Sequence, residues 1–75
     1  MSKHKEIDRE LERFGACLRR QRTSKKITQE TLAELSDLNV RTIQKIEAGQ
    51  TNILITTMLR LRNAIGCEFD DLFPH

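Results

Sequence analysis

Residues 27–49 read ITQETLAELSDLNVRTIQKIEAG, and this stretch decides the fold. Thr28 is a good N-cap, which predicts that a helix begins there and ends near Ser36. Asn39 is a second N-cap and Gly49 is typical of a helix C-terminus, so another helix is expected between them. Only about three residues separate these two helices, which is the spacing of a helix-turn-helix pair.

The sequence on either side of this pair also predicts helices. An apolar stripe at helical spacing precedes the pair and consists of Ile7, Leu11, Phe14 and Leu18. It predicts a helix over residues 5–25. A fourth helix is expected over residues 55–65 and a short fifth over residues 68–72. The predicted fold is therefore all-α, with five short helices in one domain.

Length and composition exclude several classes of protein. The chain has 75 residues, three Phe and no Trp or Tyr, so it can build only a thin core without a deep aromatic cavity. The sequence contains no run of about 18 apolar residues, so no membrane span is predicted. The charged N-terminus does not resemble a secretory signal. We therefore expect a cytoplasmic protein.

The cysteines and histidines do not form a pattern that predicts chemistry. These residues are Cys17, Cys67, His4 and His75. A structural zinc site needs about four ligands at short spacings, and here they are scattered singly. The cysteines are interpreted as reduced, apolar side chains, with a disulfide or redox switch as the alternative. No catalytic set is placed for an enzyme, and we expect no cofactor.

The positive charge is concentrated in the first third of the chain. Residues 1–26 have a net charge of +5, whereas residues 27–75 have a net charge of −3. Six basic residues and no acidic residue lie between Arg13 and Lys26. Such a cluster favours binding to a polyanion, although a charged face is often only solvated.

The helix expected over residues 40–48 has two contrasting faces. At about 100° per residue, Ile43 and Ile46 point toward the core. The opposite face carries Arg41, Gln44, Lys45 and Ala48. A face with basic and amide side chains and no acidic residue is suited to binding base edges and phosphates. The alternative is that this face is only solvated.

The stretch over residues 18–49 resembles the Cro/CI-type (XRE-like) helix-turn-helix family. The residues that carry the match are Arg22, Ile27, Thr28, Gln29, Glu30, Leu32, Ala33, Leu38, Ile43, Ile46, Glu47 and Gly49. Residues 58–73, MLRLRNAIGCEFDDLF, resemble the last two helices of the family. The resemblance implies a five-helix, lambda-repressor-like DNA-binding domain over residues 12–75. Residues 1–11 are then an N-terminal extension that lengthens the first helix.

The resemblance also implies which residues contact double-stranded DNA. Base contacts are expected from Val40, Arg41, Thr42, Gln44 and Lys45. Phosphate contacts are expected from Gln29, Arg22, Asn39, Gln50 and Asn52. The family commonly binds palindromic sites as homodimers. The similar proteins are small restriction-modification controller proteins and phage Cro-like repressors, which regulate transcription.

The family pairs two residues beneath the DNA-binding surface, and these correspond to Arg22 and Glu47. Each lies within about 40° of apolar core positions on its helix, which agrees with a structural salt bridge. The chain departs from the family at Lys26 and Asp37, where Gly is frequent. Both are turn positions where a positive φ is expected.

Three residues in or after the loop before the fourth helix do not fit the usual pattern of apolar core and polar surface. Ile53 and Leu54 lie in a loop where polar residues are usual, which favours a dimer interface over a local cover of the core. Arg62 lies on the apolar stripe of the fourth helix, so its stem extends outward or its charge pairs with Asp70 or Asp71.

The leading functional prediction is a sequence-specific transcriptional regulator that acts as a dimer on a palindromic operator. The alternative is an antitoxin-type protein-interaction module that also binds DNA. Acidic residues on the second helix and near the C-terminus are interpreted as solvated surface, with contact to RNA polymerase as the alternative.

Overall fold

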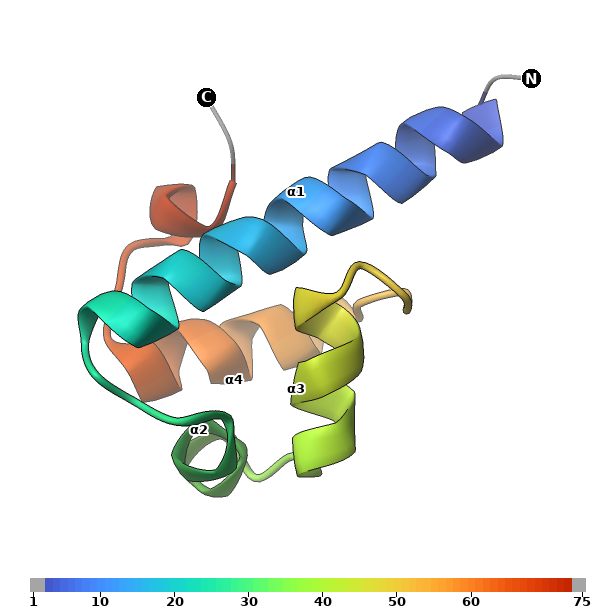
Figure 1. Cartoon of the computed structure of the whole chain (residues 1–75). Helices are drawn as coiled ribbons and strands as arrows, with labels where there is room; N and C mark the ends of the chain where they lie inside the picture. Colours follow the sequence, from blue (N-terminus) through green and yellow to red (C-terminus); the bar gives the residue numbers. More distant parts are fainter. Residues whose placement is uncertain (1–2, 74–75) are drawn as a thin grey trace.

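The computed structural model describes residues 3–73 of the chain. Within these residues it contains no strand, and its elements are α1 (Lys3–Ser24), α2 (Gln29–Ser36), α3 (Val40–Glu47), α4 (Ile55–Ile65) and the 3-10 turn η1 (Phe69–Leu72) (Figure 1). The all-α prediction is confirmed. The helix pair α2–α3 has the short connection that the sequence indicates.

The prediction of five helices is wrong in its last member, because η1 is a single 3-10 turn. Its backbone bonds run from Asp71 N to Glu68 O at 3.0 Å and from Phe73 N to Asp70 O at 3.2 Å. The Glu68 and Asp71 side chains close a capping box on this turn. Phe73 is extended, so the segment ends before an α-helical bond can form.

The N-caps expected at Thr28 and Asn39 start α2 and α3, and a glycine ends α4. Thr28 Oγ1 accepts a hydrogen bond from Thr31 N at 3.0 Å at the start of α2. Asn39 Oδ1 accepts one from Arg41 N at 2.8 Å at the start of α3. α4 ends at Gly66, whose φ of 80° requires the freedom of glycine.

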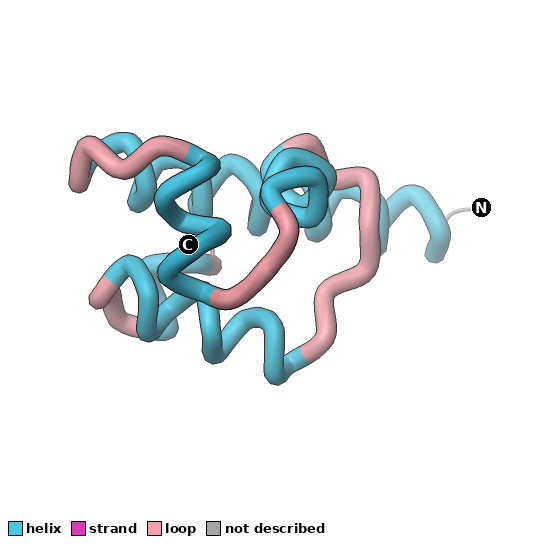
Figure 2. The backbone as a smooth tube through the Cα atoms, turned by 90° about the horizontal axis from the view of Figure 1, so that it is seen from below, coloured by secondary structure: helices cyan, strands magenta, loops and turns pink. Residues whose placement is uncertain are grey.

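The core lies between α1 and the other four elements. Its buried apolar members are Phe14, Leu18, Leu32, Ala33, Ile43, Ile46, Leu61, Ile65 and Leu72. Short loops connect the helices (Figure 2). Every element contributes to the core, so the position of each helix depends on all the others.

One apolar residue of α1, expected on the inner stripe, and one of α2 lie outside the core. Ile7 is 55% exposed because the N-terminal end of α1 extends past the rest of the molecule (Figures 1 and 2). Leu35 of α2 is 58% exposed, whereas Leu32 and Ala33 are buried. Ser36 is buried in its place, and its hydroxyl donates to the carbonyl oxygen of Leu32 at 2.6 Å.

The C-terminal end of α3 lies directly against α1. A Cβ atom at Gly15 would clash with the carbonyl oxygens of Ile46 and Glu47. A glycine at this position therefore allows the close approach that fixes where α3 leaves the core. Within residues 3–73, none of the helices has the length and apolar character needed to span a bilayer.

Candidate nucleic-acid interface

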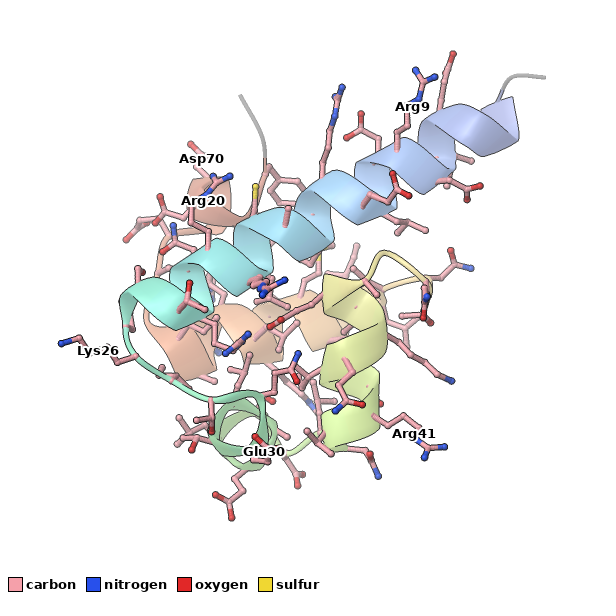
Figure 3. The ribbon with its side chains drawn as sticks, in the orientation of Figure 1. Arg9, Arg20, Lys26, Glu30, Arg41 and Asp70 are labelled. Atoms are coloured by element: carbon pink, nitrogen blue, oxygen red, sulfur yellow. The ribbon has the colours of Figure 1, made fainter. Side chains whose placement is uncertain are left out.

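α3 presents a polar face to solvent because two isoleucines hold its other face in the core. Ile43 and Ile46 are 0% and 1% exposed. Arg41, Gln44 and Lys45 are exposed, and Figure 3 shows Arg41 pointing away from the molecule. α3 is thus fixed from behind while its hydrogen-bond donors remain free for a ligand.

The five residues expected to contact bases lie together on this surface. They line one hollow with the N-cap of α3, and the lining residues are Asn39, Val40, Arg41, Thr42, Gln44 and Lys45. Val40 and Thr42 are half-buried, so mainly the longer side chains extend outward. No carboxylate lines the hollow, which leaves its charge positive. This combination suits the acceptors of a nucleic acid.

An ion pair beneath this surface joins α1 to α3. Arg22 Nε donates to Glu47 Oε2 at 2.6 Å and Nη2 donates to Oε1 at 3.0 Å, and the two side chains are 11% and 5% exposed. The hydrogen bonds to Glu47 raise the pKa of Arg22, against the lowering effect of burial. The expected Arg22–Glu47 pair is therefore present as a bidentate interaction.

The same network includes α2. Gln29 Nε2 donates to Glu47 Oε1 at 3.1 Å, and Arg22 Nη1 donates to the carbonyl oxygen of Ile27 at 2.8 Å. Sequence reasoning missed the Gln29–Glu47 bond, because it depends on how closely the start of α2 approaches the end of α3. One carboxylate thus fixes the relative positions of α1, α2 and α3.

The network changes the role expected for Arg22. Three of its N–H groups donate within the molecule, and its side chain is largely buried. This geometry is that of a residue that positions the helices, so Arg22 has no free N–H fork to offer a phosphate and differs in this from the other expected contacts.

The remaining expected phosphate contacts surround α3. Asn39, Gln50 and Asn52 are exposed, and Gln29 is half-buried at the N-terminus of α2. Backbone N–H groups at a helix N-terminus can bind an anion such as a phosphate. Gln50 and Asn52 lie in the loop that follows α3.

The two loop residues expected at a dimer interface differ in exposure. Ile53 is half-buried and packs against the core, whereas Leu54 is 71% exposed. Ile55 and Leu59 of α4 are 67% and 37% exposed. Leu54, Ile55 and Leu59 form what we call the α4 apolar surface.

Two departures from the family, and an arginine expected on the apolar stripe of α4, have clear structural outcomes. Lys26 and Asp37 have φ values of 58° and 57°, as the family pattern predicts for turn positions that often hold Gly. Arg62 lies over the ring of Phe69 at 5.9 Å and bonds to Asn63 Oδ1 through Nε and Nη2. In the described chain it makes no ion pair with Asp70 or Asp71, so the alternative of an acidic partner is wrong.

Comparison with solved structures agrees with this geometry. The restriction-modification controller protein C.AhdI from Aeromonas hydrophila is 41% identical, with a TM-score of 0.82 over 84% of this chain and 96% of that chain. The clp gene regulator ClgR from C. glutamicum is 27% identical, with a TM-score of 0.79 over 83% of this chain and 80% of that chain. No curated protein sequence matches the chain significantly.

A family model described as helix-turn-helix matches residues 18–72, which is most of the chain. These residues include both helices of the pair, the Arg22–Glu47 ion pair and the whole polar face of α3. The chain belongs to the XRE-like helix-turn-helix family and is a DNA-binding transcriptional regulator.

Proposed function

We propose that this regulator recognises a specific DNA sequence by placing α3 in the major groove of double-stranded DNA. The observation that carries the proposal is the exposed face of Arg41, Gln44 and Lys45 on a helix held by two buried isoleucines. The major groove admits a helix and displays a distinct set of donors and acceptors for each base pair. Arg and Gln have base partners there with two hydrogen bonds each.

The contacts divide into those that specify sequence and those that position the protein. Base contacts are assigned to Val40, Arg41, Thr42, Gln44 and Lys45. Phosphate contacts are assigned to Gln29, Asn39, Gln50 and Asn52. The last four lie at helix ends or in the loop after α3, where short polar side chains can reach a backbone without entering the groove.

We further propose that the protein binds as a homodimer to a palindromic operator. Leu54 and Ile55 are neighbouring apolar side chains that are largely exposed to water. A second copy of the chain is the simplest partner that would cover them. Twofold symmetry would then place two α3 helices one DNA turn apart. The likeness to C.AhdI, a restriction-modification controller protein, supports a controller role.

Contact with RNA polymerase is a further part of this proposal. Glu68, Asp70 and Asp71 are exposed around η1, on a different part of the surface from α3. An acidic surface that stays free when α3 is bound to DNA can meet a basic surface on the polymerase.

Selection of bound duplexes from a random DNA pool tests the proposal directly. The expected result is an enriched palindrome whose half-sites are centred about 10 base pairs, or a multiple of that spacing, apart. An enriched sequence without twofold symmetry would contradict the dimer. Recovery of no preferred sequence at low salt would contradict specific recognition.

A second candidate is an antitoxin-type module whose main partner is another protein. The α4 apolar surface favours it, because such a surface also suits a heterologous partner. Sedimentation at micromolar concentration separates the candidates. A purified protein that is dimeric alone supports the homodimer, and one that remains monomeric with and without DNA supports the alternative.

A further inference from the structure

Two carboxylates of α1 lie against the loop that follows α3. Asp8 and Glu12 line one hollow together with Leu11 and residues 49–52. A Cβ atom at Gly49 would lie 2.7 Å from both Cα and Cγ of Glu12, so α1 and the loop are in close contact. The hollow includes Gln50 and Asn52, to which the proposed function assigns phosphate contacts.

These carboxylates lie beside the loop without a basic partner among the side chains that the structure describes. Within residues 6–73 the ion pairs are Arg13–Glu10 and Arg22–Glu47, so neither Asp8 nor Glu12 has a basic partner there. Both are exposed, and they lie near the C-terminal end of α3, where the helix dipole is negative. A carboxylate at that end of a helix is unfavourable, in contrast to Glu30 in the first turn of α2.

We infer that Asp8 and Glu12 are negative determinants of DNA affinity, which repel the phosphates that approach Gln50 and Asn52. This inference rests on the proposed function, since it requires DNA at the loop after α3. Exposed charges interact over about 8–10 Å at moderate ionic strength, a range that covers neighbouring groups in one hollow. Asp8 and Glu12 precede residues 18–72, so they lie outside the part that the family model matches.

The effect of this repulsion is independent of the DNA sequence. Phosphates carry no sequence information, so the two carboxylates weaken binding to every duplex by a similar factor. The operator and the competing non-specific sites are weakened by the same factor, so the specificity ratio is unchanged while the absolute affinity falls. The carboxylates therefore set the sequence-independent part of the affinity.

The test replaces each carboxylate by its amide, in the variants Asp8→Asn and Glu12→Gln and in the double variant. Amides keep the size of the side chains, so the packing of Glu12 against Gly49 is retained. We expect each single variant to bind two- to fivefold more tightly at low salt, about the Coulomb energy of one exposed pair. The selected operator and a random duplex of equal length should gain the same factor, and the gain should shrink as salt is raised.

Asp70→Asn is the matched control, because it makes the same change of charge on η1. Figure 3 shows Asp70 far from Arg41, at the opposite end of the molecule. The inference is contradicted if Asp8→Asn and Glu12→Gln bind as the wild type does, or gain no more than Asp70→Asn. Equal melting temperatures show that folding is unchanged, and the DNA-binding loss of Arg41→Ala tests the proposed function separately.

Discussion

α3 and α4 bury similar inner faces and expose very different outer ones. Two apolar side chains of each helix reach the core, Ile43 and Ile46 on α3 and Leu61 and Ile65 on α4. The outer face of α3 is polar and carries no carboxylate, whereas the start of α4 exposes Leu54 and Ile55. Core packing therefore fixes where each helix lies, and the outer face determines what it can bind: a polyanion on α3, an apolar protein surface on α4.

The largest expected effect comes from the ion pair that holds α3. Glu47→Ala leaves the largely buried guanidinium of Arg22 without its partner and releases the side chain of Gln29. Breaking one side of such a pair costs about 3–5 kcal/mol of unfolding free energy, a large part of what a small domain has. Urea denaturation monitored by circular dichroism measures the loss.

The control is Glu10→Ala, which removes an exposed pair with Arg13 in which the side chains are 64% and 60% exposed. Exposed pairs contribute at most about 1 kcal/mol, so this variant should unfold near the wild-type midpoint. A wild-type midpoint for Glu47→Ala would show that the pair does not hold α3 in place.

The α4 apolar surface gives the next effect, on association and not on folding. Leu54→Ser should weaken the dimer about 10- to 100-fold, because burial of a leucine contributes roughly 1.5–3 kcal/mol. Its unfolding midpoint, extrapolated to low protein concentration, should stay close to the wild-type value, since Leu54 is 71% exposed in the monomer. Analytical ultracentrifugation measures the change, and an unaltered dimer constant would place the interface elsewhere.

The smallest expected effect leaves both outer faces unchanged. Lys26 has a φ of 58°, and a left-handed conformation costs a residue with a side chain about 1–2 kcal/mol. Lys26→Gly removes that strain, but glycine has the greater conformational entropy in the unfolded chain, which offsets part of the gain. The net free energy of unfolding should rise by about 0.5–1 kcal/mol. Thermal melting measures it, with Thr23→Gly inside α1 as the opposite control. Destabilisation by Lys26→Gly would show that the lysine side chain itself holds the turn.

The sequence predicted the parts of the fold that depend on local signals. Thr28 and Asn39 act within one helical turn, so the starts of α2 and α3 follow from them. The positive φ at Lys26 and Asp37 was expected from the family resemblance, because the family often has Gly at these turn positions. The polar face of α3 also follows, because a helix of known phase has a known outer side.

The parts that depend on neighbouring elements were not predictable. A helical wheel gives the direction of Ile7, but its exposure depends on where the elements beside α1 end. Ser36 replaces Leu35 in the core because its hydroxyl is satisfied by the carbonyl of Leu32. Two further interactions also require contacts between separate elements: the placement of Arg62 over the ring of Phe69 and the hydrogen bond between Gln29 and Glu47.

The central claim is that the outer face of α3 meets base edges, and Arg41→Ala tests it most directly. The affinity of the wild type and the variant is measured for every single-base-pair substitution of the selected operator, at one fixed salt concentration. If Arg41 contacts a base, the variant should lose about 1–3 kcal/mol of discrimination between bases at one position in each half-site. Its discrimination at every other position should be unchanged. A loss that is equal at all positions, or no loss at all, would contradict the account.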